Sequence, residues 1–134
     1  MTAGYSGTPL PKKLGIAPGR RAAALHAPKQ YTKLLGAPAG VRIGSRLAAD
    51  LDFIHAFFRS ADDLAAAFPK LKESLAKDGM LWISWPKKSS PLAGDIDEGR
   101  VRSIGLENGL VDVKVCAVDE DWSGLKFVRR LRDR

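Results

Sequence analysis

Residues 51–58, LDFIHAFF, place apolar side chains at consecutive positions, so both faces of an extended chain would be apolar here. This pattern is typical of a central strand in a parallel sheet, where helices cover both faces. Residues 80–85, MLWISW, form another predicted strand, which ends at Pro86. Parallel strands need crossover connections, which are usually helical, so these runs favour an α/β sheet.

The segments around these runs supply the helices and the other strands. Ser60 is a typical N-cap, and the two acids that follow it suit the start of a helix that Gly79 ends. Pro69 interrupts that helix and predicts a kink or a division into two. The predicted order is strand 22–25, helix 28–35, short strand 41–43, strand 51–58, the helix capped by Ser60, strand 80–85, a helix opened by Asp95 and Glu98 and ended by Asn108, and a hairpin of 111–118 with 125–131. This order predicts a three-layer α/β domain with a mainly parallel sheet that ends in an antiparallel hairpin.

The positive charge of the chain is concentrated at its start. Residues 1–49 hold eight bases and no acid, whereas residues 50–134 hold 14 bases and 15 acids, so the first third accounts for the net charge of +7. The first twenty residues also contain four glycines and three prolines, which predicts an irregular basic arm before one α/β domain at 21–134. No apolar run approaches the roughly 18 residues of a membrane span. One cysteine, Cys116, excludes an internal disulfide.

Basic and polar residues gather at the predicted carboxyl ends of the parallel strands, the edge of an open α/β sheet where ligands bind. The candidate residues at these ends are His26, Arg59, Ser84, Trp85, Lys87 and Lys88. Such an edge could hold a phosphate or a carboxylate. The alternative is a solvated basic rim without a ligand.

Two similar segments, PLPKKLG at 9–15 and WPKKSSPLAG at 85–94, each present a pair of adjacent lysines. These lysines are Lys12 and Lys13 in the first segment and Lys87 and Lys88 in the second. We interpret them as two arms of one anion-binding surface, with Trp85 and Trp122 as strand-end aromatics that could stack a base or anchor a partner. A coincidental repeat is the alternative.

The turn after the first predicted strand reads LHAPKQY and is a poor match to a nucleotide-type cofactor site. Such a site needs glycines that let backbone N–H groups approach the ligand, whereas this turn has none and includes a proline. No acid stands about 20 residues further on, where one would bind a ribose. We therefore expect no cofactor and no methyl transfer, and two histidines 29 residues apart predict no metal site.

Few residues indicate catalysis. His55 lies inside an apolar strand and is expected to be a hydrogen-bonded core residue. His26, at a strand end, is the better candidate for acid–base chemistry, and Ser84 could act as a nucleophile only beside a base. The acids at 119–121 are expected to form a solvated turn rather than a cation site.

Five segments carry a family resemblance, in this order: YSGTPLPKKLGI, DLDFIH, DGMLWISWPKK, GLVDVKVCAVDEDWSGLKFV and the terminal RLRDR. With them the chain resembles, over essentially its full length, an uncharacterised bacterial family, number 3052 among the domains of unknown function. The resemblance implies a bacterial cytoplasmic protein and brings no activity, cofactor or catalytic residue. The section from the helix before DGMLWISWPKK onward also resembles the second half of a class I methyltransferase, which has a Rossmann-like fold.

These features favour a non-catalytic binding module that takes an anionic partner, either a protein surface or a phosphorylated ligand. Two alternatives stay open. The first is a minimal enzyme on a methyltransferase-like scaffold, with His26 and Ser84 at the strand ends. The second is weak nucleic-acid binding through the basic first third, which no recognised motif supports.

Overall fold

The computed structural model describes residues 9–36 and 40–134 and contains one six-stranded mixed sheet. Its elements are α1 (Leu10–Leu14), β1 (Ala22–Leu25), α2 (Tyr31–Leu35), β2 (Ile43–Gly44), β3 (Leu51–Phe57), α3 (Ala61–Ser74), β4 (Leu75–Pro86), α4 (Glu98–Glu107), β5 (Leu110–Ala117), β6 (Trp122–Arg129) and a final 3-10 turn, Leu131–Asp133. The strand order is β2-β1-β3-β4-β6-β5. The first four of these strands are parallel, and β6 is antiparallel to both β4 and β5. The predicted α/β sheet with an antiparallel end is therefore confirmed.

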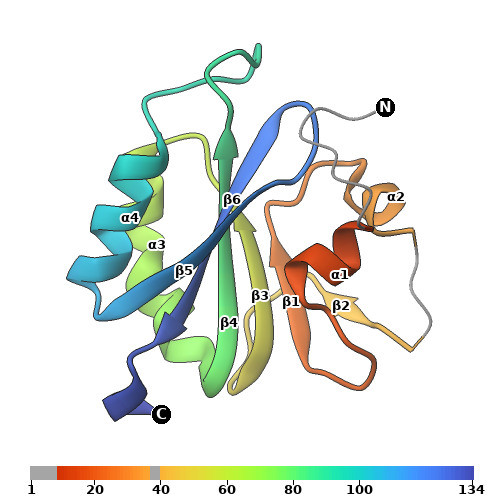
Figure 1. Ribbon diagram of the computed structural model, residues 1–134, viewed down its shortest axis with the longest axis vertical. Helices are drawn as coiled ribbons and strands as arrows, with labels where there is room; N and C mark the ends of the chain where they lie inside the picture. The colour runs from red at the N-terminus through yellow and green to blue at the C-terminus, as the bar shows by residue number, and fades with distance from the viewer. Residues whose placement is uncertain (1–8, 37–39) are drawn as a thin grey trace.

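Helices lie on both faces of the sheet, with α3 and α4 on one side and the short α1 and α2 on the other (Figure 1). Alternate residues of β4 pack on opposite faces of the sheet, because successive side chains of a strand point to opposite sides. Leu81 and Ile83 pack in the core cluster that contains Phe68 of α3. Trp82, between them, packs in the second cluster with Leu14 of α1.

The α3 helix begins where the sequence predicts and ends earlier. Ser60 caps it, since the Ser60 hydroxyl accepts a hydrogen bond from the backbone N–H of Asp63. The helix runs through Pro69 as one element and stops at Ser74, so the predicted end at Gly79 is wrong. Residues from Leu75 onward belong instead to β4, which starts five residues before the predicted strand.

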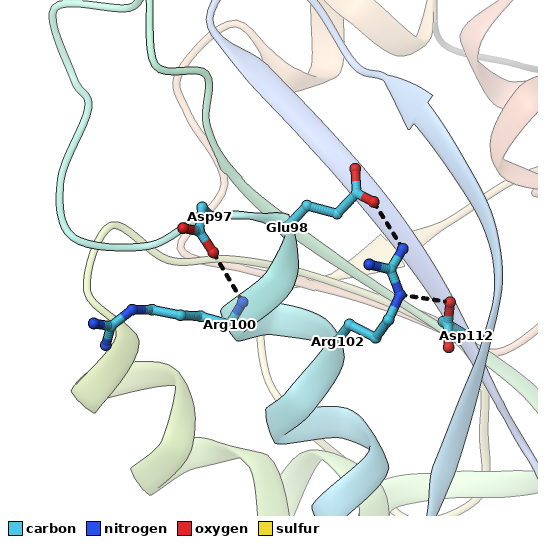
Figure 2. Close-up of polar contacts among 5 residues, drawn as sticks. All are labelled: Asp97, Glu98, Arg100, Arg102 and Asp112. Atoms are coloured by element: carbon cyan, nitrogen blue, oxygen red, sulfur yellow. Dashed lines mark hydrogen bonds and ion pairs between the residues drawn. The ribbon is translucent and has the colours of Figure 1, made fainter.

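The α4 helix is capped by Asp97 rather than by Asp95, as Figure 2 shows. The Asp97 carboxylate accepts a hydrogen bond of 2.9 Å from the backbone N–H of Arg100. Asp95 accepts from the backbone N–H of Ala61 and so joins the loop before α4 to the start of α3. In the same view, Arg102 donates to Glu98 at 2.7 Å and to Asp112 at 2.9 Å, which ties α4 to β5.

Part of the predicted irregular arm is ordered. Residues Leu10–Leu14 form the α1 helix, so the expectation of an irregular segment is wrong there; residues 1–8 lie outside the described structure. Leu14 is fully buried, and its carbonyl accepts a 2.8 Å hydrogen bond from the indole Nε1–H of Trp82. This contact fastens α1 to the middle of the sheet. The domain boundary proposed at residue 20 stays a prediction.

The longest helix, α3, has 14 residues. Within the described ranges, no helix has the length and apolar character required to cross a membrane.

Candidate functional site

A buried chain of polar side chains joins α2 to the centre of the sheet. The Tyr31 hydroxyl lies 2.9 Å from Nδ1 of His55, and Nε2 of His55 lies 2.7 Å from the Ser84 hydroxyl oxygen. His55 and Ser84 are fully buried, and Tyr31 is nearly so. Burial lowers the pKa of His55 to about 3 and raises the pKa of Tyr31 above its ordinary value. His55 is therefore neutral at physiological pH, and the prediction of a hydrogen-bonded core histidine is confirmed.

The structure separates the two residues of the predicted catalytic pair. Ser84 has no solvent exposure, and its hydroxyl is bonded to His55. His26 is exposed, and its ring packs edge-on against Phe58 with ring centres 5.4 Å apart. A shared site open to substrate therefore does not exist for His26 and Ser84, because the Ser84 hydroxyl is sealed within the core.

The two Pro-Lys-Lys segments converge on the turn between β5 and β6. Nζ of Lys13 donates to the carbonyl of Ala117 at 3.0 Å, and Nζ of Lys87 donates to the carbonyl of Asp119 at 2.7 Å. The two segments therefore meet at one turn, and the anion-binding surface predicted for them stays a prediction. Their lysines act there as donors that hold the turn, while Lys12 and Lys88 are exposed.

The acidic turn differs from the solvated one that the sequence predicts. Asp119 is buried, and its carboxylate accepts hydrogen bonds from the backbone N–H groups of Asp121 and Trp122 at 2.8 and 2.9 Å. It also accepts from Nε2 of Gln30 at 3.3 Å, which links the turn to the start of α2. Asp119 thus has a structural role in the turn. Glu120 is the exposed acid of the three.

The two strand-end tryptophans do not form an exposed aromatic surface. Trp85 and Trp122 are each 5% exposed and belong to the two core clusters, Trp122 packing edge-on against Phe57. The prediction that they stack a base or anchor a partner from the surface is wrong, because both side chains are packed within the core. Arg59 stays exposed, and its Nε donates to the carbonyl of Leu92.

The structure brings together three lysines from segments far apart in the sequence, Lys13, Lys114 and Lys126, which we call the cationic sheet face. Lys114 of β5 and Lys126 of β6 are direct partners across the strand pair. Lys126 is also the partner of Trp82, whose side chain lies on the α1 face. Nζ of Lys114 donates to the carbonyl of Lys13 at 3.3 Å, which places α1 beside the two strands.

No acid neutralises the cationic sheet face within the described structure. The α1 sequence LPKKL has no acid, and alternation along the hairpin places apolar or small side chains beside the lysines on this side. The neighbours on this side are Val111 and Cys116 of β5 and Gly124 and Val128 of β6. The ion pairs of the described residues, Arg102 with Glu98 and with Asp112, lie elsewhere.

The residues predicted from the sequence did not include Lys114 and Lys126, because only lysines in predicted loops were considered as binding residues. The signal was present in the strand pattern: Lys126 stands between Leu125 and Phe127, both fully buried, so its side chain must point to the opposite face. The same alternation, interrupted by a bulge between Asp112 and Lys114, places Lys114 beside it.

A pocket of about 360 Å³ lies between α2 and the carboxyl ends of β1 and β2. Its walls include Ala24, Tyr31, Leu35 and Ile43. Tyr31 thus contributes both to this wall and to the buried polar chain. The pocket lies at the edge of the sheet where open α/β folds bind ligands.

Comparison with known proteins gives a family and a fold. The family described as a protein of unknown function (DUF3052) matches residues 43–131, about two thirds of the chain. No curated protein sequence matches the chain.

Solved structures with similar folds are methyltransferases and related proteins. Magnesium protoporphyrin IX methyltransferase from Synechocystis, with bound SAM, has a TM-score of 0.60 at 14% identity, over 90% of this chain and 74% of that one. A SAM-dependent methyltransferase from Aquifex aeolicus has a TM-score of 0.60 at 15% identity, over 87% and 85% of the two chains. The pyocyanin biosynthetic protein PhzM has a TM-score of 0.66 at 13% identity, over 90% of this chain and 53% of its own. At these identities the similarity establishes a methyltransferase-like Rossmann fold.

The residues around the pocket do not fit SAM, which the first of these structures contains. In the turn after β1, Pro28 has no backbone N–H to donate, and His26 occupies the left-handed region at φ 55°. Among the described residues that line the pocket, none is acidic, so no carboxylate is placed there to bind ribose hydroxyls or balance a sulfonium charge. In the described residues, the turn after β1 and the pocket lining therefore lack the features that usually hold this cofactor.

Proposed function

We propose a binding function for this chain, which belongs to the DUF3052 family of proteins of unknown function. In this proposal the protein is a non-catalytic module whose cationic sheet face takes an acidic surface of a partner protein. The site is the one formed by α1, β5 and β6, with Lys114 and Lys126 at its centre. The partner supplies carboxylates opposite these lysines.

The direct pairing of Lys114 with Lys126 carries the proposal. Like charges opposite each other on neighbouring strands destabilise a sheet, and the Lys13 ammonium, bonded to the carbonyl of Ala117 on β5, adds a third positive charge to this face. A carboxylate that approaches this face would convert the repulsion into attraction, so the arrangement favours binding of an anion over the free state. Lys114 is exposed and Lys13 and Lys126 are half-buried, so a large partner can reach this face.

The neighbouring side chains support a protein partner rather than a nucleic acid. Val111, Cys116 and Val128 are half-buried beside the lysines and offer apolar contact area around the charges. Proteins that bind single-stranded nucleic acids without sequence preference use exposed aromatic rings on which bases stack. In residues 9–36 and 40–134, every Phe, Tyr and Trp is buried, so the described surface has no such platform.

Burial of Ser84 also supports a non-catalytic role. The enzyme alternative needs Ser84 beside a base that substrate can reach, but its hydroxyl is enclosed and bonded to the neutral His55. The pKa of His55, lowered to about 3 by burial, makes this imidazole a weak base.

The test uses a fluorescent octaglutamate peptide as the probe and anisotropy as the readout, at about 0.15 M salt. Lys114→Glu with Lys126→Glu should weaken peptide binding about tenfold or more, because two attractive charges become repulsive. Lys70→Glu with Lys77→Glu is the matched control, since it makes the same charge change at exposed positions on α3 and the start of β4. Equal losses in the two double variants, or no binding by the unchanged protein, would overturn the proposal.

A short DNA duplex, titrated in parallel, separates the two classes of partner. We expect it to bind more weakly than the peptide at this salt concentration. Tighter DNA binding that falls steeply with salt and depends on the same lysines would assign the face to nucleic acid and overturn the protein-partner proposal.

A further inference from the structure

The pocket between α2, β1 and β2 has an apolar interior. Ala24, Leu35 and Ile43 form part of its walls, and the exposed residues Thr32 and Ser45 bring hydroxyl groups to it. Its volume of about 360 Å³ is within the range of small-molecule sites. A ligand that fits this interior has an apolar body.

The charged residues adjacent in sequence to the pocket lining are all positive, and the Asp119 carboxylate near the start of α2 is buried and already accepts three hydrogen bonds. Four exposed bases, Lys29, Lys33, Arg42 and Arg46, each follow or precede a residue that lines it. Residues 1–49 contain no acid, so no carboxylate from this part of the chain balances them. The local field therefore opposes a cation and attracts an anion.

From these two properties we infer that the pocket binds a small organic anion with an apolar body, such as an aromatic or branched-chain carboxylate. The apolar part enters between α2 and β2, and the anionic group stays at the rim near the bases. The lining of this pocket shares no residue with the cationic sheet face, whose strands β5 and β6 lie at the other end of the sheet.

The buried polar chain fixes one wall of the pocket. The Tyr31 ring lines the pocket, and its hydroxyl is held 2.9 Å from Nδ1 of His55 on β3. The ring also packs edge-on against Phe57, with ring centres 5.4 Å apart. Because two neighbours constrain this side chain, the wall is in place before the ligand arrives, which reduces the entropy that binding must overcome.

Three molecules of nearly identical shape test the charge preference: benzoate, the neutral benzamide and the cationic benzamidine. Each is titrated into the ¹⁵N-labelled protein, and amide shifts of Thr32, Leu35 and Gly44 report on the pocket. Benzoate should bind with a millimolar dissociation constant, several-fold tighter than benzamide, and benzamidine should bind weakest. Binding of benzamidine as tight as that of benzoate, or no shift of these amides by any of the three, would overturn the inference.

Two variants separate the shape of the pocket from its charge. Thr32→Trp should block the pocket and remove the shifts for benzoate and benzamide alike. Lys33→Gln with Arg42→Gln should weaken benzoate binding about fourfold, about twofold for each charge, and leave benzamide unchanged. Lys70→Gln with Lys77→Gln, away from the pocket, should change neither; an equal effect of this control would contradict the assigned role of the rim.

The variants of each site serve as controls for the other. Lys114→Glu with Lys126→Glu should leave the benzoate-induced shifts in the pocket unchanged, and Thr32→Trp should leave binding of the octaglutamate peptide unchanged. If benzoate instead shifts amides of β5 and β6 alone, it binds at the cationic sheet face and the pocket inference fails.

Discussion

Tyr31 and His55 are held together across two elements of the fold, the hydroxyl of one lying 2.9 Å from Nδ1 of the other. Because Nε2 of the same imidazole lies 2.7 Å from the Ser84 hydroxyl oxygen, the contact continues into β4. This chain fixes the short α2 helix, only five residues long, on the sheet. The histidine therefore serves the architecture that shapes the pocket.

Tyr31→Phe keeps the ring and removes one end of the polar chain. Nδ1 of His55 then has no partner in a fully buried site, so we expect the free energy of unfolding to fall by about 1–3 kcal/mol. Urea denaturation followed by circular dichroism measures the change. A loss below about 0.5 kcal/mol, the usual range for surface substitutions, would show that the hydrogen bond contributes little.

The stability of the protein should decrease in mild acid through His55. The pKa of His55 is about 3 in the folded state, and its reference value of 6.5 applies to the unfolded chain. Between these two pH values, the unfolded chain therefore binds a proton that the folded chain does not. Stability is therefore fully present above about pH 6.5 and falls as the pH drops, by roughly 2 kcal/mol between about pH 7.5 and pH 5. Urea denaturation at the two pH values should show this loss. His55→Gln should remove it, whereas His26→Gln, at an exposed position, should retain it.

Gly105 allows α4 to approach β6 closely. A Cβ atom at this position would overlap the ring of Phe127, which is fully buried. We therefore expect Gly105→Ala to destabilise the fold by about 1–3 kcal/mol, despite the roughly 1 kcal/mol by which alanine favours a helix. Gly99→Ala in the same helix is the control, because its Cβ would meet Asp97 Oδ1 at an ordinary 3.5 Å. Thermal unfolding should show no loss for Gly99→Ala; equal effects at both sites would contradict the packing argument.

Lys126→Gln should stabilise the free protein and weaken its binding. The substitution removes one charge of the Lys114–Lys126 pair, which should raise the free energy of unfolding by about 0.2–1 kcal/mol. The same change removes an attractive charge and should weaken octaglutamate binding several-fold. Chemical denaturation and anisotropy on the same sample measure both effects. A loss of stability would show that the lysine is kept for packing rather than for a ligand.

Much of the fold could be predicted from local patterns. The apolar run at Leu51–Phe57 and the Ser60 cap appear in the structure where the sequence places them. The end of α3 could not be predicted from Gly79, because pairing of Leu75 with Leu51 in the sheet draws the intervening polar residues into β4. The end of α3 is thus set by strand pairing, whereas the only signal in the local sequence was the helix-ending Gly79.

The candidate site was less accessible to prediction, because its parts are distant in sequence. Lys13 and Lys114 are 101 residues apart, and only the packing of α1 on the sheet joins them. The burial of Trp85 and Trp122 likewise depends on elements that cover the strand ends, which a position at a strand end does not reveal. A basic binding surface that includes Lys13 therefore stays a prediction, and the structure adds Lys114 of β5 and Lys126 of β6 to that surface.

Mapping where the octaglutamate peptide binds tests the central claim most directly. In a titration of the ¹⁵N-labelled protein, the account predicts the largest amide shifts at Lys13, Lys114, Cys116 and Lys126, the centre of the cationic sheet face. Shifts confined to Arg59, Lys87 and Lys88 at the carboxyl edge of the sheet, or no saturable shifts at all, would contradict it.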